Sequence, residues 1–109
     1  MDRVTTALSE VVRQEVSSYA TEGYNGAGQR SRLYYVENQP DQVFSVVAPY
    51  DPAYKRADLV LMARIVNNQV IIDIDKTSKS LYDALKRAGV PREQIVLAYT
   101  GESVPTSRS

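Results

Sequence analysis

The chain opens with a pattern of hydrophobic positions that predicts an amphipathic helix. From Asp2 onward, apolar residues recur at intervals of three and four, and charged residues lie between them. The apolar positions are Val4, Leu8, Val12, Val16 and Tyr19. We expect this helix to end near Gly23, because the glycine-rich segment 23–31 that follows is costly to order and suits a loop.

A first antiparallel pair of strands is predicted after this loop. Residues 32–37 and 43–48 are rich in Tyr, Val and Phe, which favour strands. The intervening segment, Asn38-Gln39-Pro40-Asp41, supplies turn residues. We expect Pro49 to end the second of these strands and residues 50–57 to form a longer excursion.

A second hairpin, within residues 58–75, has a register that follows from its turn. Asn67 and Asn68 can occupy the two positive-φ positions of a tight turn. If they do, six apolar side chains share one surface. The expected pairs are Ile65–Val70, Ala63–Ile72 and Leu61–Ile74. The opposite surface, which we expect to be half exposed, carries Val60, Met62, Arg64, Val66, Ile71 and Asp73.

A second helix and a final strand complete the predicted order. Thr77 or Ser78 can cap the helix, and Gly89 is placed to end it in a left-handed conformation. Val90 can then fold back onto the helix, and residues 95–99 form a last extended segment. The apolar stripe of the helix consists of Leu81, Tyr82 and Leu85.

These elements predict a single α+β domain over residues 1–101 with a loose tail over 102–109. The expected order is an N-terminal helix, an antiparallel sheet of about four strands arranged as a meander with a central hairpin, a second helix and a short C-terminal strand. With 109 residues, 43% of them hydrophobic, the chain has the size and composition of an ordinary globular domain.

Charge and composition narrow the functional classes. Thirteen basic residues balance thirteen acidic ones, so no overall field attracts a polyanion and direct nucleic-acid binding is not favoured. Cysteine and histidine are absent, which removes disulfides, the usual zinc sites and the common proton-transfer residue. The N-terminal twenty residues contain no long apolar run, so we expect a cytoplasmic protein with no membrane contact and no cofactor.

Two aspartates are weak candidates for a metal site. Asp73 and Asp75 are two apart on a predicted strand, and with Asp58 or a water they could hold a divalent ion. Arg64 and Lys76 would neutralise them, however, as on an ordinary solvated sheet face. We therefore expect no metal and no catalytic residue.

Apolar side chains on the half-exposed face of the predicted sheet, or tyrosines in the loop after the second strand, point instead to an interface. Tyrosine offers contact area with a polar tip, and apolar strand residues left uncovered favour self-association into a homodimer. The interface candidates are Tyr50, Tyr54, Val60, Met62 and Ile71. An alternative is direct DNA binding through a local basic patch consisting of Lys76, Lys79, Lys86, Arg87 and Arg92.

Three blocks of sequence together resemble a known family. They are Met1-Asp2-Arg3-Val4, the hairpin end Asn67-Asn68-Gln69-Val70-Ile71-Ile72-Asp73, and the run Ala88-Gly89-Val90-Pro91-Arg92-Glu93-Gln94-Ile95-Val96-Leu97-Ala98-Tyr99. The chain resembles the XisI-like proteins, the fdxN element excision controlling factors of cyanobacteria. It departs from their pattern at residues 39–42 and 48–50, so the resemblance is to a divergent member.

The resemblance implies a regulatory role. Such proteins act with a nuclease-like companion of the XisH type in the programmed excision of a DNA element by a separate recombinase. No catalytic motif of the family maps onto this chain. We therefore expect a non-enzymatic accessory protein that binds an XisH-like nuclease; the open alternative is a small metal-dependent enzyme or ligand-binding domain that uses Asp73 and Asp75.

Overall fold

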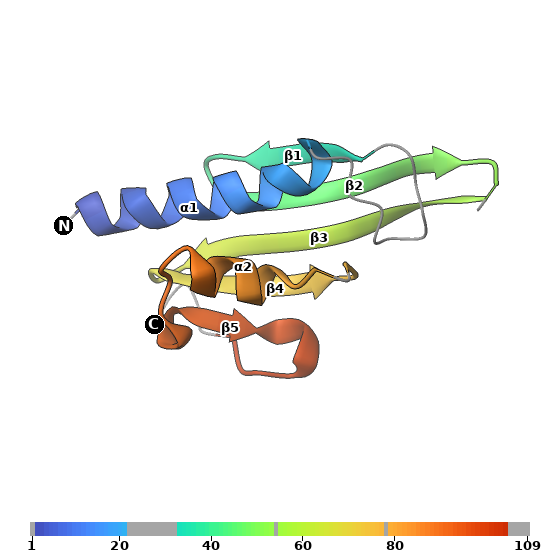
Figure 1. The fold of residues 1–109 in the computed structure, drawn as a ribbon. Helices are drawn as coiled ribbons and strands as arrows, with labels where there is room; N and C mark the ends of the chain where they lie inside the picture. The colour runs from blue at the N-terminus through green and yellow to red at the C-terminus, as the bar shows by residue number, and fades with distance from the viewer. Residues whose placement is uncertain (1, 22–32, 54, 78, 105–109) are drawn as a thin grey trace.

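The computed structural model describes residues 2–21, 33–53, 55–77 and 79–104, with the side chains of residues 2–7 and 21 left out. Two helices lie on one face of a five-stranded sheet whose strand order is β1-β2-β3-β4-β5 (Figure 1). This confirms the predicted α+β class and the predicted order of elements. The sheet is mixed, because its last strand joins parallel to β4.

Helix α1, Asp2–Thr21, follows from the spacing of its apolar side chains. The side chains of Leu8, Val12, Val16 and Tyr19 are at most 6% exposed and face the sheet. At its C-terminal end, the Tyr19 hydroxyl donates to the carbonyl oxygen of Lys79 at 2.5 Å. The helix is therefore attached to the chain segment that precedes the second helix.

Strands β1, Tyr34–Asn38, and β2, Val43–Asp51, form the predicted antiparallel pair. The Asn38 side chain accepts from the N–H of Asp41 at 3.1 Å, and Gln42 takes a positive φ of 52° to close the turn. The expectation that Pro49 ends the second strand is wrong. The pairing is irregular between Ala48 and Asp51, where a residue without an N–H is tolerated, and β2 continues through it.

Strands β3, Arg56–Val66, and β4, Gln69–Asp75, form the central hairpin. Asn67 and Asn68 have φ values of 50° and 66°, as the turn requires. The register matches the prediction as far as the Ala63–Ile72 pair and then shifts. A bulge leaves Asp73 without an opposite residue, so that the last pairs are Met62–Ile74 and Leu61–Asp75, and the expected Leu61–Ile74 pair is wrong.

Helix α2, Leu81–Arg87, is capped by the Ser80 hydroxyl, which accepts from the N–H of Asp83 at 3.3 Å. Thr77 has a different role, described below, and Ser78 lies outside the described residues. Gly89 ends the helix with φ +104°, and the N–H of Val90 donates to the carbonyl oxygen of Leu85 at 3.0 Å. Both features were predicted from the sequence.

The C-terminal strand is shorter than predicted. After a 3-10 turn, η1, at Arg92–Gln94, strand β5 spans Ile95–Leu97, and Ala98–Thr100 form a second 3-10 turn, η2. The carboxylate of Glu102 accepts from the N–H of Leu97 at 2.9 Å and from Arg92 at 2.6 Å. The first residue of the predicted loose tail is therefore anchored, and residues 105–109 lie outside the described residues.

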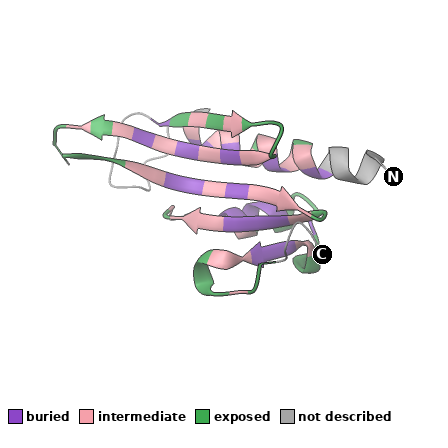
Figure 2. Ribbon diagram, turned by 180° about the vertical axis from the view of Figure 1, so that it is seen from behind, coloured by how far each residue is buried: buried purple, intermediate pink, exposed green. Residues whose placement is uncertain are grey.

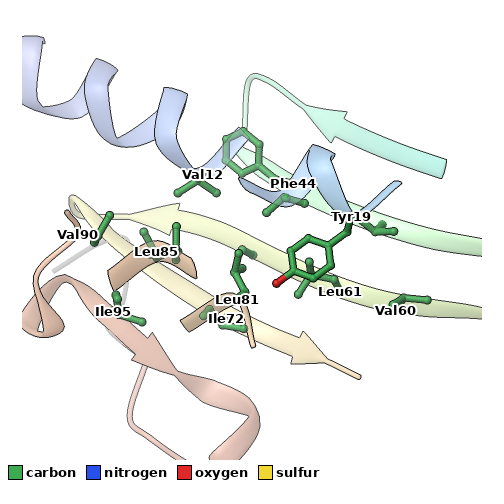
Figure 3. Packing of buried hydrophobic residues seen from close by; sticks show 14 of the residues in the cluster. Val12, Tyr19, Phe44, Val60, Leu61, Ile72, Leu81, Leu85, Val90 and Ile95 are labelled. Atoms are coloured by element: carbon green, nitrogen blue, oxygen red, sulfur yellow. The ribbon is translucent and has the colours of Figure 1, made fainter. Parts of the chain in front are cut away.

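The hydrophobic core lies between the helices and the sheet. Figure 3 shows how Val12 and Tyr19 of α1 and Leu81 and Leu85 of α2 converge on the strands. Their strand partners in the core include Phe44, Val46, Val60, Leu61, Ala63, Val70, Ile72 and Ile95. Burial of this kind is the main favourable term in folding, at about 25 cal/mol per Å² of apolar surface.

The opposite face of the sheet, called here the helix-free face, is seen in Figure 2. By the register, it presents Tyr34, Val36, Ser45, Met62 and Arg64, and α1 and α2 lie on the other face. Beyond the Val47–Leu59 pair, β2 and β3 pair only with each other among the described strands. This two-stranded extension, residues 48–53 and 55–58, is called the arm and projects past the other strands (Figure 1).

Candidate functional site

A cluster of ionisable side chains joins α1 to the first hairpin. The guanidinium of Arg13 donates to both carboxylate oxygens of Glu37, with Nε–Oε1 at 3.0 Å and Nη2–Oε2 at 3.1 Å. Its third nitrogen donates to Glu10 at 2.8 Å. The hydroxyl of Tyr35 donates to Glu37 Oε1 at 2.7 Å, and the guanidinium carbon lies 6.0 Å from the centroid of the Phe44 ring. A helix and a strand are thus linked by charge.

A small polar cavity of about 240 Å³ opens beside this cluster. It is lined by Ser9, Arg13, Glu37, Gln39, Gln42 and Phe44. Polar side chains that line it already hydrogen-bond to one another, since the Ser9 hydroxyl donates to the side-chain oxygen of Gln42 at 2.9 Å. Pockets that hold small molecules usually measure roughly 300–1,000 Å³. The size and the internal hydrogen bonds argue against a substrate site here.

The electrostatics of the cluster hold its groups in fixed protonation states. The hydrogen bond from Arg13, followed by that from Tyr35, lowers the pKa of Glu37 from 4.5 to about 2. Burial, followed by the hydrogen bond to Glu37, raises the pKa of the Tyr35 hydroxyl well above its ordinary value. A general acid or base needs a pKa near the working pH. The cluster therefore has the chemistry of a structural ion pair.

The aspartates considered as metal ligands contact basic and backbone groups of the chain. Asp73 accepts two hydrogen bonds from Arg64, from Nε to Oδ2 at 2.7 Å and from Nη2 to Oδ1 at 3.2 Å, as the predicted diagonal placement allows. Asp58 accepts from Arg56 Nε at 2.9 Å. Within the described residues, no three acidic, histidine or cysteine side chains are grouped to hold a metal ion. The structure does not bring Asp58, Asp73 and Asp75 together.

Asp75 organises the start of α2. Its Oδ1 accepts from the N–H of Thr77 at 3.0 Å, and its Oδ2 accepts from the N–H of Leu81, the first residue of the helix, at 2.9 Å. The hydroxyl of Thr77 bonds to Oδ1 as well. Helix N-termini leave N–H groups without intrahelical partners, and a carboxylate there also interacts favourably with the helix dipole. Asp75 is therefore a capping residue for α2.

The structure separates the five predicted interface candidates. Tyr50 lies on the arm and is 63% exposed, the highest value among the large hydrophobic side chains of the described residues. Met62 is half-buried on the helix-free face. Val60 and Ile71 are 0% exposed, so neither offers surface to a partner in this conformation. Val60 is buried because it is the residue skipped by the bulge between β2 and β3, which turns it into the core. Tyr54 lies outside the described residues.

Basic residues around α2 contact aromatic rings. Lys86 Nζ and the guanidinium carbon of Arg92 each lie 5.4 Å from the centroid of the Tyr82 ring. Arg92 also donates to the carbonyl oxygen of Ile95 at 2.6 Å. These contacts hold α2, η1 and β5 together, which gives two members of the proposed basic patch a structural role.

The comparison with protein families decides which one this chain belongs to. The model of the family described as XisI protein matches residues 1–107. The chain belongs to the XisI family. The resemblance read from the three sequence blocks is thereby confirmed, and the match extends over both helices and all five strands.

Solved structures share the fold of this XisI-family protein. An XisI-like protein from Anabaena variabilis gives a TM-score of 0.73 at 18% identity, covering 86% of this chain and 85% of that chain. The fdxN element excision controlling factor XisI from Anabaena variabilis gives a TM-score of 0.71 at 17% identity, covering 97% and 99%. At these identities the likeness concerns the fold. No curated protein matches the chain.

Sequence reasoning missed the Arg13–Glu37–Tyr35 cluster. The helical pattern places Arg13 beside the apolar stripe, and the alternation of the strand places Tyr35 and Glu37 on one face. Neither pattern predicts that α1 packs against the face of β1 that carries Tyr35 and Glu37. The one signal in the sequence is that Tyr35 and Glu37 share a face, which is common in strands and carries no specificity.

Proposed function

We propose that this XisI-family protein is a non-enzymatic accessory protein that regulates the excision of a DNA element by binding a protein partner. The family supports a controlling role, since one relative with this fold is named as an fdxN element excision controlling factor. The partner that we propose is an XisH-like nuclease. None of the helices in the described segments is long and apolar enough to cross a membrane.

The observation that carries the proposal is the arm with its exposed tyrosine. The arm is formed by the far ends of β2 and β3, which pair there only with each other among the described strands, and a two-stranded ribbon by itself is marginally stable at best. Tyr50 is 63% exposed on it. Tyrosine is enriched in protein interfaces because it supplies a large contact area with few rotatable bonds. The arm is therefore suited to insert into a partner.

The state of the ionisable groups supports a role without catalysis. Among the described residues, the shifted pKa values of arginine and glutamate trace to contacts within the chain. The pKa of Arg13 is raised by Glu37, that of Glu37 is lowered by Arg13, and that of Arg64 is raised by Asp73. The pKa of Glu102 is lowered by the N–H of Leu97 and then by Arg92. In the same part of the chain, every fully buried side-chain nitrogen or oxygen has a hydrogen-bond partner. None of these groups is held ready to act on a substrate.

Co-expression tests the proposal. The chain is produced together with an XisH-like nuclease from the same genome, and the mixture is separated by size-exclusion chromatography with light scattering. We expect a complex of defined mass, and we expect Tyr50→Ala to weaken it at least about tenfold, as for an aromatic residue central to an interface. The matched control is Tyr99→Ala, at a 44% exposed tyrosine on η2. Separate elution at every salt concentration would contradict the proposal.

Metal titration tests the enzymatic alternative. If Asp73 and Asp75 served a metal-dependent activity, Mn²⁺ or Mg²⁺ would produce saturable heat in a calorimeter, and Asp73→Asn would abolish it. We expect no such heat, because Arg64 holds both oxygens of Asp73. Saturable binding that is lost in Asp73→Asn would replace our proposal with a metal-dependent one.

A further inference from the structure

Strand β1 forms an edge of the sheet, and no described strand lies along its outer side. Its five residues pair with β2 in continuous register, without a bulge. Native proteins usually protect such an edge with lysine, proline or a bulge, because unpaired backbone groups invite another strand. From Tyr34 to Asn38 the strand contains no lysine, no proline and no bulge. Within the described residues, the edge is therefore open to pairing.

The side chains of this strand are unusually apolar for an exposed edge. Tyr34 is 47% exposed and Val36 is 50% exposed, and both lie on the helix-free face. The register places Val36 beside Ser45 and then Met62, which is half-buried. Apolar surface thus reaches the edge of the sheet, where a second strand would cover it.

The sequence of β1 is complementary to itself when the strand is reversed. In an antiparallel pair centred on Val36, that residue faces its own copy, and Tyr34 faces Asn38 of the partner subunit. Tyr35 faces Glu37 of the partner subunit, and within one chain the Tyr35 hydroxyl already donates to Glu37. Glu37, the one charged residue of the strand, is neutralised by Arg13. No like charges are opposed in this arrangement, which is what a symmetric interface requires.

We propose that two copies of this chain pair through β1, antiparallel about a two-fold axis at Val36, so that the sheet continues from one copy into the other. The proposal goes beyond binding of a partner through the arm, because it uses the edge strand β1, whereas the arm is formed by β2 and β3. A second copy fits this edge better than an unrelated extended segment does, since the opposed residues are matched by the strand's own sequence.

Cysteine cross-linking tests the axis directly, because the chain contains no cysteine. Residues directly opposed in an antiparallel pair have Cβ atoms about 4.5–5.5 Å apart, and a disulfide joins Cα atoms about 4.4–6.8 Å apart. Val36→Cys should therefore form a disulfide-linked dimer under mild oxidation. The matched control is Val104→Cys, at a 38% exposed valine of the C-terminal segment, which should cross-link at least about tenfold more slowly.

The register has its own test on the same face of β1. A mixture of Tyr34→Cys and Asn38→Cys should cross-link readily, while each variant alone should cross-link slowly, because each faces the other position. Equal rates for Val36→Cys and Val104→Cys, or fast cross-linking of Tyr34→Cys alone, would overturn the proposed axis.

A charge pair at the axis tests the dimer without oxidation. Val36→Lys and Val36→Glu each place like charges opposite one another, and each should weaken the dimer at least about tenfold in light scattering over a concentration series. An equimolar mixture should restore a dimer, because Lys then faces Glu. Circular dichroism of each variant checks that the exposed site leaves the fold intact. Tyr50→Ala, on the arm, should leave the dimer unchanged. A wild-type chain that stays monomeric at all concentrations, or a Val36→Lys chain that dimerises like the wild type, would overturn the proposal.

Discussion

Arg13 of α1 and Glu37 of β1 form a two-point ion pair across 24 residues of sequence, with nitrogen–oxygen distances of 3.0 and 3.1 Å. The Glu37 side chain is 14% exposed, so solvent screens the pair only in part. A fork-to-fork pair also fixes orientation, because both guanidinium nitrogens must face both oxygens. The pair therefore sets the position of α1 over the first hairpin in addition to the packing of Val12 and Val16.

Acid should lower the free energy of unfolding of the protein by protonating Glu37. Its pKa is lowered from 4.5 to about 2 in the folded protein, so ionised Glu37 stabilises the fold fully above pH 4.5. That contribution is lost as the pH falls from 4.5 through about 2. We expect Glu37→Gln to have a lower free energy of unfolding than wild type at neutral pH. The difference in free energy of unfolding between wild type and Glu37→Gln should shrink as the pH approaches 2, as measured by urea unfolding at a series of pH values.

The matched variant for this prediction is Arg13→Met, which removes the partner and keeps the aliphatic stem. It should reduce the same pH dependence, and the double variant with Glu37→Gln should be less destabilised than the sum of the two single ones. A gap between wild type and Glu37→Gln that stays constant from neutral pH to pH 2 would show that Glu37 is not the titrating group.

The Arg64–Asp73 pair on the helix-free face should contribute modestly to the stability of the fold. The side chains are 32% and 22% exposed, and cross-strand ion pairs contribute about 0.2–1 kcal/mol. A double-mutant cycle with Arg64→Met and Asp73→Asn should therefore give a coupling free energy of about 0.5–1 kcal/mol. The coupling should shrink at high salt, because the pair is partly in solvent. No coupling at low salt would contradict the assignment.

Asp75 should matter as a cap for α2. Asp75→Ala leaves the N–H groups of Thr77 and Leu81 without their carboxylate acceptor, and we expect it to lower the free energy of unfolding by about 1–2 kcal/mol. Asp75→Asn retains one oxygen and should cost less. Denaturant unfolding of the two variants checks this order. An Asp75→Ala chain as stable as wild type would remove the capping role.

Gly89 should be sensitive to the addition of a single methyl group. Its φ is +104°, and a Cβ built there meets no atom within 4 Å, so the cost of Gly89→Ala is backbone strain alone. We expect a loss of about 1–2 kcal/mol in the free energy of unfolding. Gly101, with φ +103° and equal space, provides the comparison, and Gly101→Ala should cost a similar amount. A neutral Gly89→Ala would mean that the helix end relaxes into another conformation.

Local patterns predicted the elements well and failed where the pairing depends on distant parts of the chain. The Asn67-Asn68 turn set the register of the central hairpin as far as Ala63–Ile72, because a tight turn allows few alternatives. Beyond that pair, the bulge at Asp73 shifted the remaining pairs by one residue. A bulge serves the twist and packing of the whole sheet, and the period-two pattern contains no sign of it.

In the candidate site too, local contacts were predicted and contacts between distant parts of the chain were missed. The Arg64–Asp73 contact was foreseen because the two residues belong to one hairpin, with a short separation along the chain. The Arg13–Glu37 pair was missed, and Val60 was placed on the exposed side, because both depend on how α1 and β2 lie against strands that are distant in sequence.

The sequence by itself determined the type and order of the helices and strands, the turn at Asn67-Asn68 and the glycine stop at Gly89, because these depend on side-chain spacing and on the backbone freedom of single residues. Only the tertiary structure decided which face of the sheet the helices cover, where the strands bulge, and that β1 is an edge of the sheet among the described strands. Those features come from contacts between segments far apart in the chain, whose energies depend on the packed arrangement as a whole.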